Sequence, residues 1–169
     1  MTQDNPIPGR DAAVSLREVT YANLFEVLDL KVKPEQECLV APNSVSISEA
    51  HFWPTGRFRA IYAVDTPVGF VMIDDHYLAD ENRTLELRKK GVDDYYLQRF
   101  MIDGEHQGKG YGFRAMELVI EHVKSRPNAT QMTTNQVTGD SNAGEFYKKL
   151  GFEHTGEEDR GELEMRLVF

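Results

Sequence analysis

The pattern of apolar and polar side chains predicts three strands in the first half of the chain. Residues 14–19 alternate apolar and polar side chains, which is the period of a half-buried strand. Two further β-prone runs, residues 59–64 and 68–73, flank the turn sequence Asp65-Thr66-Pro67. These two runs therefore predict a β-hairpin.

Two short helices and one long helix are predicted before Pro127. Thr20 can cap a helix that extends to about residue 30, and residues 44–52 form a helical segment that ends before Pro54. The long helix follows the glycines near residue 110. Its apolar residues recur at helical spacing and form one buried stripe: Gly112, Ala115, Met116, Val119, Ile120 and Val123.

The remaining elements follow from the apolar runs between and after these helices. Residues 95–102 are apolar and aromatic enough for a central strand, and residues 130–135 form a short β-prone run. Residues 141–150 predict a helix that ends at Gly151, and residues 162–169 predict a final strand. The expected fold class is α+β.

The ends of the pattern define one domain. Residues 1–12 show no periodicity and predict a ragged N-terminus, so the single domain is expected over residues 13–169. The charged stretch 74–90 gives no clear secondary-structure signal.

Composition limits the class of protein. The chain has 169 residues, of which 40% are hydrophobic, and this fits one domain with a real core. Nineteen Lys and Arg against 28 Asp and Glu give a formal charge of -9. This balance argues against nucleic-acid binding and favours a cationic partner, although it can also serve solubility alone.

Localisation and metal content are bounded by what the sequence lacks. No run approaches the roughly 18 apolar residues of a membrane span, and the N-terminus has no basic region followed by an apolar run. We therefore expect a cytoplasmic protein without a membrane partner. Cys38 is the single cysteine, which excludes an internal disulfide and a zinc site built on two cysteines. No other cluster has ligand spacing, so no metal is expected.

The glycine-rich segment Gly108-Lys109-Gly110-Tyr111-Gly112 lies between a predicted strand and a predicted helix. Glycines at alternate positions let a ligand approach the backbone and direct successive N–H groups toward one point. The helix N-terminus adds further N–H groups and a favourable dipole for a pyrophosphate, with Lys109 and Arg114 nearby. A tight turn with close packing is the alternative.

Two familiar phosphate motifs do not fit this segment. The P-loop pattern G-x-x-x-x-G-K-[ST] is absent from the sequence. Residues 110–115 match the Rossmann pattern G-x-G-x-x-A, but no acidic residue ends the next predicted strand and too little chain remains for a parallel sheet. If the segment binds phosphate, it therefore does so as neither of these two motifs.

Two motifs give the chain a family resemblance. The segment Gln107-Gly108-Lys109-Gly110-Tyr111-Gly112 resembles the signature of the GNAT superfamily of acyl-CoA-dependent N-acyltransferases: Gln or Arg, two residues, Gly, one residue, then Gly or Ala. Ala143, Tyr147 and Gly151-Phe152 resemble a later helix of the same family. Segments across nearly the whole chain, including Pro34-Glu35-Gln36, resemble the bacterial spermine/spermidine acetyltransferase branch.

The resemblance implies a mixed, mostly antiparallel sheet of six or seven strands with helices on both faces. The sheet would splay open after the central strand, and acetyl-CoA would enter that splay as acyl donor. Backbone groups of Phe100, Met101 and Ile102 would bind its pantetheine arm, and Gln107, Gly108, Lys109, Gly110, Tyr111 and Gly112 would bind its pyrophosphate. The family commonly has a cofactor-binding Asn where Asp140 stands, so by resemblance the nearby Asn142 would be a further cofactor contact.

The family's general acid corresponds to Tyr147, although Tyr147 could instead belong to an aromatic packing cluster. The general base stays open, because Gln98 stands where related polyamine acetyltransferases can have Glu. Asp103 and His106 are candidates by type alone, as are several groups expected at the acceptor. The acceptor residues predicted are Glu35, Gln36, Asp74 and Asp75, with Asp80 and Glu81 in the same acidic run.

The sequence thus favours an acetyl-CoA-dependent N-acetyltransferase of a small primary amine, with spermidine or spermine preferred and direct attack in a ternary complex. The alternatives are acetylation of a protein N-terminus, an amino acid or an aminoglycoside, and a non-catalytic acyl-CoA-binding module. The oligomeric state stays open, a homodimer included.

Overall fold

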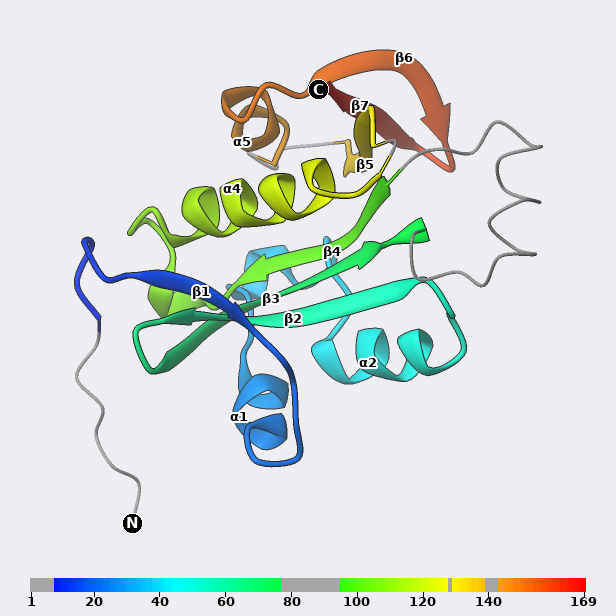
Figure 1. Ribbon diagram of the computed structural model, residues 1–169. Helices are drawn as coiled ribbons and strands as arrows, with labels where there is room; N and C mark the ends of the chain where they lie inside the picture. Colours follow the sequence, from blue (N-terminus) through cyan, green and yellow to red (C-terminus); the bar gives the residue numbers. More distant parts are fainter. Residues whose placement is uncertain (1–7, 77–94, 128, 139–142) are drawn as a thin grey trace.

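The computed structural model describes residues 8–76, 95–127, 129–138 and 143–169. Its strands form one seven-stranded sheet in the order β1-β2-β3-β4-β5-β7-β6 (Figure 1). β4 and β5 run parallel, and the other neighbouring pairs are antiparallel. The strands are β1 (Val14–Arg17), β2 (Gly56–Ala63), β3 (Thr66–Asp74), β4 (Tyr95–Ile102), β5 (Gln131–Val137), β6 (Glu153–Asp159) and β7 (Glu162–Val168).

Helices cover both faces of the sheet (Figure 1). α4 (Tyr111–Lys124) and α5 (Ala143–Lys149) pack on one face, over a core that includes Ile61, Val71 and Leu97. α1 (Leu24–Asp29) and α2 (Asn43–His51) pack on the other, over a second core that includes Phe70 and Met101. Short 3₁₀ turns lie at Pro34–Gln36 and Gly104–His106. The predicted α+β class is confirmed.

A β-bulge in β4 changes which side chains face each core. Met72 pairs with Arg99 and Ile73 pairs with Leu97, so Gln98 is the extra residue of the bulge. Leu97 and Phe100 therefore face the same core although they are three residues apart. The bulge shifts the alternation of β4 by one residue.

The central splay begins at the same residue. β4 and β5 are paired only from Tyr95 to Leu97, opposite Met132 to Thr134. Beyond that point, residues 98–102 have no ladder partner on the β5 side, while their other edge stays paired with β3. The backbone of β4 is thus open to a ligand along half of its length.

Most predicted elements are confirmed, and the differences have local causes. α1 begins at Leu24 and not near Thr20, because the Asn23 side chain accepts a hydrogen bond from the backbone N–H of Thr20 and holds a turn there. The sequence did not predict β6, whose side chains are almost all exposed. Most of the unassigned stretch 74–90 lies outside the described residues.

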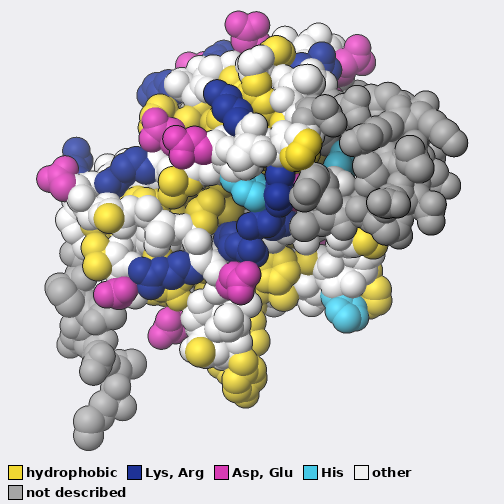
Figure 2. All heavy atoms as spheres, in the orientation of Figure 1, with side chains coloured by type: hydrophobic (Ala, Val, Ile, Leu, Met, Phe, Trp, Pro, Cys, Tyr) yellow, Lys and Arg dark blue, Asp and Glu magenta, His cyan; other side chains and the backbone are white. Residues whose placement is uncertain are grey.

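The surface carries mixed charge. Acidic and basic side chains are interspersed on the face seen in Figure 2, so the charge of -9 does not form one acidic patch on that face. Among the described residues, none of the helices is both long enough and apolar enough to span a bilayer.

Candidate active site

The glycine loop joins β4 to α4. Gly108 and Gly110 have φ angles of +76° and +80°, in the left-handed region that favours glycine, and a Cβ at either position would meet nothing within 4 Å. Gly112 has an ordinary φ, and a Cβ there would lie 3.4–3.6 Å from Ile102, Phe100 and Phe146. The first two glycines therefore shape an open loop at the start of α4, whereas Gly112 packs.

Two side chains of the loop segment form hydrogen bonds with other parts of the protein. The Tyr111 side chain is buried, and its hydroxyl lies 2.6 Å and 2.8 Å from the carbonyl oxygens of Pro8 and Gly9. The Gln107 amide donates to the Oε1 of Gln36 at 2.7 Å and to the carbonyl of Ile102 at 3.0 Å. At these positions only the backbone is left for a phosphate, while Lys109 is half-buried.

A cavity of about 180 Å³ occupies the splay. It is lined by β4, β5, α5 and the segment around the Pro34–Gln36 turn. Its lining residues are Val32, Gln36, Leu39, Val40, Phe100, Met101, Ile102, Gln107, Asn135, Gln136, Val137, Ala143 and Tyr147. The structure thus gathers the three predicted backbone positions of β4, Gln36, Gln107 and Tyr147 around one space.

Tyr147 is 8% exposed and lies on α5. Burial raises the pKa of its phenol to about 12, a hydrogen bond with the Thr134 hydroxyl opposes that rise, and Tyr96 adds to it. Its ring packs against Phe146 and Phe152, with centroids 5.3 Å and 5.6 Å away. Tyr147 therefore packs in an aromatic cluster, and it is also one of the residues that line the cavity.

The three residues of β4 that are predicted to bind the pantetheine arm differ in the contacts that they already make within the protein. Phe100 stacks on Phe146 at a centroid distance of 5.6 Å, which forms one wall of the splay. The side chain of Met101 belongs to the core under α1 and α2. The Ile102 carbonyl already accepts from Gln107, so part of its hydrogen-bonding capacity is used.

The structure does not bring Asp74 and Asp75 to the cavity. Both lie at the end of β3 that adjoins the start of β4, where β4 and β5 are still paired. Although burial alone would raise the pKa of Asp74, hydrogen bonds from His76 and Thr55 hold it below its ordinary value. Asp75 is fully buried and accepts from His122 Nε2 at 3.1 Å and from Arg126 Nη2 at 2.6 Å. Both carboxylates are therefore engaged by side chains of the protein itself, away from the cavity.

The other acceptor-side and base candidates are placed as follows. Gln36 lines the cavity, and Glu35 is exposed on the same turn. Asp103 accepts from the backbone N–H groups of Lys31 and Glu105, at 2.9 Å and 3.0 Å, so it caps chain segments. Burial lowers the pKa of His106, whose ring lies against Tyr111. Asn142, Asp140, Asp80 and Glu81 lie outside the described residues.

Sequence reasoning missed the contribution of β5 and its neighbours. Asn135 and Gln136 line the cavity, and the Thr134 hydroxyl donates to the Leu97 carbonyl at 3.2 Å, beside Tyr147. Glu162 pairs with Val137 across β5 and β7, and it raises the pKa of Tyr96 after burial. The available signal was the polar run Thr133 to Gln136 in a strand at the centre of a sheet, because polar groups there need partners.

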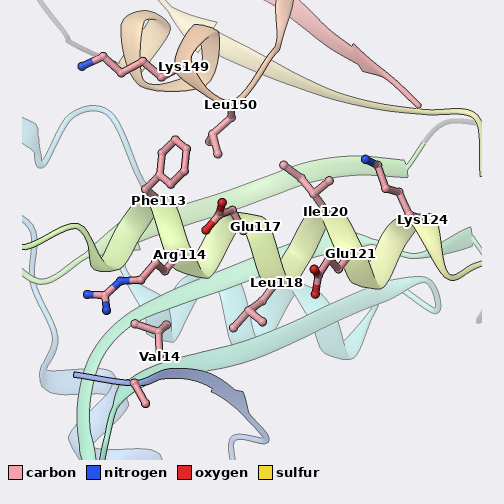
Figure 3. Close-up of a pocket in the computed structure, with 11 residues that line it drawn as sticks. Val14, Phe113, Arg114, Glu117, Leu118, Ile120, Glu121, Lys124, Lys149 and Leu150 are labelled. Carbon is pink, nitrogen blue, oxygen red and sulfur yellow. The ribbon is translucent and has the colours of Figure 1, made fainter. Parts of the chain in front are cut away.

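A larger hollow of about 600 Å³ lies on the outer side of α4, between β1 and the end of α5 (Figure 3). Arg114, Glu117, Glu121, Lys124 and Lys149 surround an apolar floor that includes Val14 and Leu118. Of the residues that the sequence places near the pyrophosphate or the acceptor, Arg114 alone lines it. Within the described part of the chain, no group of three or more His, Cys, Asp and Glu side chains could hold a metal ion.

Residues 25–152 match the acetyltransferase (GNAT) family. The chain belongs to the GNAT acetyltransferase family. The matched range includes both the open part of β4 and the glycine loop at the start of α4. The chain is an acetyltransferase enzyme.

This GNAT protein is similar to a curated relative in sequence and to solved structures in fold. It is 27% identical over 151 residues to the spermine/spermidine N(1)-acetyltransferase of Bacillus subtilis (strain 168), covering 87% of this chain and 92% of that protein. A crystal structure of an aminoglycoside acetyltransferase, AAC(6')-Ib, in complex with coenzyme A has a TM-score of 0.70 at 16% identity, covering 92% and 95%. A spermidine N-acetyltransferase SpeG chimera from Vibrio cholerae and hSSAT has a TM-score of 0.64 at 15% identity, covering 92% and 94%.

Proposed function

We propose that the protein transfers the acetyl group of acetyl-CoA to a small primary amine, with spermidine or spermine as the preferred acceptor. The observation that carries this proposal is the cavity in the splay, where Tyr147 meets the unpaired backbone of β4. The named relative at 27% identity acts on spermine and spermidine, and this favours a polyamine among the amines.

The donor side is built from backbone groups. Acetyl-CoA supplies a thioester-activated acetyl group when it is bound. The open loop at Gly108 and Gly110 offers N–H groups at the positive end of the α4 dipole, which suits a pyrophosphate. The unpaired edge of residues 98–102 can bind the amides of the pantetheine arm as a neighbouring strand would.

The acceptor must lose a proton before it attacks. An alkyl amine has a pKa near that of lysine, about 10.4, so almost all of it is charged at neutral pH. The described lining of the cavity contains amides and apolar groups and no Asp, Glu or His, so we assign no side chain in contact with the amine as its base. The amine proton is therefore proposed to pass to water, and the carboxylate of Glu162, which lies opposite a residue of the lining and acts on Tyr96, adds negative charge near the acceptor.

Direct attack in a ternary complex fits the nucleophiles that are present. The single cysteine, Cys38, is exposed and is not among the lining residues. No acyl-enzyme is therefore proposed.

Tyr147 stabilises the leaving thiolate. A phenol with a pKa of about 12 is a weaker acid than a thiol of about 8.5, so complete proton transfer in water would be uphill. Inside the cavity the phenol can donate a hydrogen bond to sulfur as negative charge develops, and the proton follows as the thiolate loses its solvation. This role requires the hydroxyl and not the ring alone.

An amine panel tests the function. Purified protein is mixed with acetyl-CoA and with spermidine, spermine, an amino acid, a peptide N-terminus or an aminoglycoside, and free thiol is followed. Fastest turnover with a polyamine is expected. Turnover only with an aminoglycoside, amino acid or peptide would remove the polyamine and keep the acetyltransferase, and binding of acetyl-CoA without turnover of any amine would favour a binding module.

A further inference from the structure

The N-terminal residues 8–12, here called the N-terminal arm, are fastened to the start of α4. The Tyr111 hydroxyl is shared between the carbonyls of Pro8 and Gly9. Arg114 donates from Nη1 to Ala12 at 2.8 Å and from Nη2 to Arg10 at 2.6 Å. Residues 8–12 are therefore held against the start of α4 by hydrogen bonds from two of its side chains.

Arg114 contacts the glycine loop at the same time. Its Nε and Nη2 lie 3.4 Å from the carbonyl oxygens of Gly110 and Lys109, respectively. With the two arm contacts, four of the five guanidinium N–H groups are directed at backbone carbonyls of the arm and the loop. Arg114 thus links these two segments, in place of the direct phosphate contact that its charge suggested.

The loop carbonyls determine where the loop N–H groups point. In a planar trans peptide the C=O and the following N–H point in opposite directions. The Lys109 carbonyl shares its peptide with the Gly110 N–H, and the Gly110 carbonyl shares its peptide with the Tyr111 N–H. The Gly110 carbonyl also accepts the backbone N–H of Arg114, at 3.3 Å, in the first turn of α4. The Arg114 side chain contacts both loop carbonyls, so the N–H group of each of these two peptides points away from the guanidinium.

We propose that the N-terminal arm sets the affinity for acyl-CoA, with Tyr111 and Arg114 as the positioning residues that fasten the arm to the glycine loop and direct the Gly110 and Tyr111 N–H groups toward the pyrophosphate. This inference rests on the proposed function, because it takes the loop to be the pyrophosphate site. It assigns Tyr111 a role through its side chain that does not include contact with the cofactor.

Two substitutions test the arm. Tyr111→Phe removes the hydroxyl that is hydrogen-bonded to the arm and keeps the ring in the core. Arg114→Lys keeps the charge but cannot span the four carbonyls. Each should raise the KM for acetyl-CoA about three- to tenfold, the size expected for one lost hydrogen-bonded contact, with kcat within about twofold. The double variant should show less than the product of the two effects, because both release the same arm.

A second acyl donor and a control variant distinguish an effect on the pyrophosphate site from a general effect on the protein. Acetyl-pantetheine carries the same thioester without the pyrophosphate, so its KM should be the same in the wild type and the variants. Lys124→Gln removes a positive charge from the last turn of the same helix and should leave the KM for acetyl-CoA unchanged.

Three results would overturn the inference. An unchanged KM for acetyl-CoA in both single variants would detach the arm from the site. A loss in Tyr111→Phe that is equally large with acetyl-pantetheine would make the arm a general support of the fold. A wild-type KM equal for both donors would remove the pyrophosphate from the loop, and with it the donor side of the proposed function.

Discussion

The two ends of the β4–β5 pair contrast in charge and in space. At the closed end, where β4 and β5 are hydrogen-bonded, Asp75 is surrounded by His122, Arg126 and, at 3.9 Å, Arg57. At the open end the cavity of about 180 Å³ is lined by amides, apolar groups and one phenol. The closed end has the residue types of an acid–base site, but Asp75 is fully buried.

The contrast shows that the position of the cavity follows from where β4 and β5 stop pairing, and not from where titratable side chains are most dense. A buried carboxylate ringed by cations is already neutralised and has no room for a substrate. A strand that loses its partner has free backbone groups and leaves space beside them. In β4 the bulge at Gln98 separates the two situations.

The largest expected effect falls on the closed end. Asp75→Asn removes the anion that two arginines and a histidine share, and it should lower the free energy of unfolding by about 3 to 5 kcal/mol, the usual cost of breaking a buried charge pair. Chemical denaturation measures it, with Asp65→Asn as the control, because the Arg17–Asp65 pair is exposed. Unchanged stability with lost turnover would move the active site to this end.

Tyr147→Phe is the corresponding test of the open end. Removing the hydroxyl while keeping the ring should lower kcat on the order of 10²-fold or more and change the acetyl-CoA affinity much less. Steady-state kinetics with a reactive amine and calorimetry with CoA check the two parts. If kcat and its pH profile match the wild type, the thiolate leaves without Tyr147 and the residue serves packing alone.

The same phenol should affect stability at high pH. Its pKa is raised from 10.0 to about 12 in the folded protein, so the unfolded chain releases this proton first. The stabilisation is complete below about pH 10 and is lost as the pH rises toward 12, by about 1.4 kcal/mol at pH 11. Urea unfolding at pH 9 and pH 11 should show this loss in the wild type relative to Tyr147→Phe. A parallel decline in both proteins would contradict the burial of an unionised phenol.

The glycine loop at the open end should separate two kinds of glycine. Gly110→Val places a β-branched side chain at a φ of +80° and on the ligand side, so it should weaken acetyl-CoA binding about tenfold or more. Gly112→Ala meets only ordinary contacts and should change the affinity by less than about threefold. Calorimetry measures the acetyl-CoA affinity of both folded variants. Equal losses of affinity would mean that Gly112 belongs to the binding loop in the same way as Gly110.

The smallest effect is expected where the open end meets solvent. Glu162→Gln removes a half-buried carboxylate that acts on Tyr96 and should raise the KM for a polyamine about two- to fivefold, the size of a charge interaction screened by solvent. The difference should shrink in high salt. Glu157→Gln on the exposed strand β6 is the matched control. An equal change in both variants would indicate a general effect of net charge.

Periodicity predicted most of the fold because most elements have one buried side. It failed for β6, where nearly every residue is exposed and no apolar alternation exists to be read. The turn of the β2–β3 hairpin was placed slightly late, since Val64 itself takes a φ of +54° in the turn. A β-branched residue gives no local signal for that conformation.

The residues of the site that belong to sequence motifs could be predicted from the sequence, and the others could not. The glycine loop and Tyr147 carry recognisable spacing, and Gln36 was reached through a resembling segment; the roles proposed for these residues stay predictions. Asp74 and Asp75 were chosen by charge, and charge says nothing about which end of a strand pair is open. Asn135 and Gln136 were missed, because only the register with β4 shows that they lie beyond its last paired residue.

β6 has a further consequence for how the molecule behaves among its copies. It forms one margin of the sheet, and its register with β7 is interrupted between His154 and Glu158. An unpaired strand margin is a template for edge-to-edge aggregation, and carboxylates there oppose it by mutual repulsion. The exposed Glu157, Glu158 and Asp159 therefore disfavour the addition of a strand from another copy at this margin, and high salt, which screens their charge, should weaken that protection.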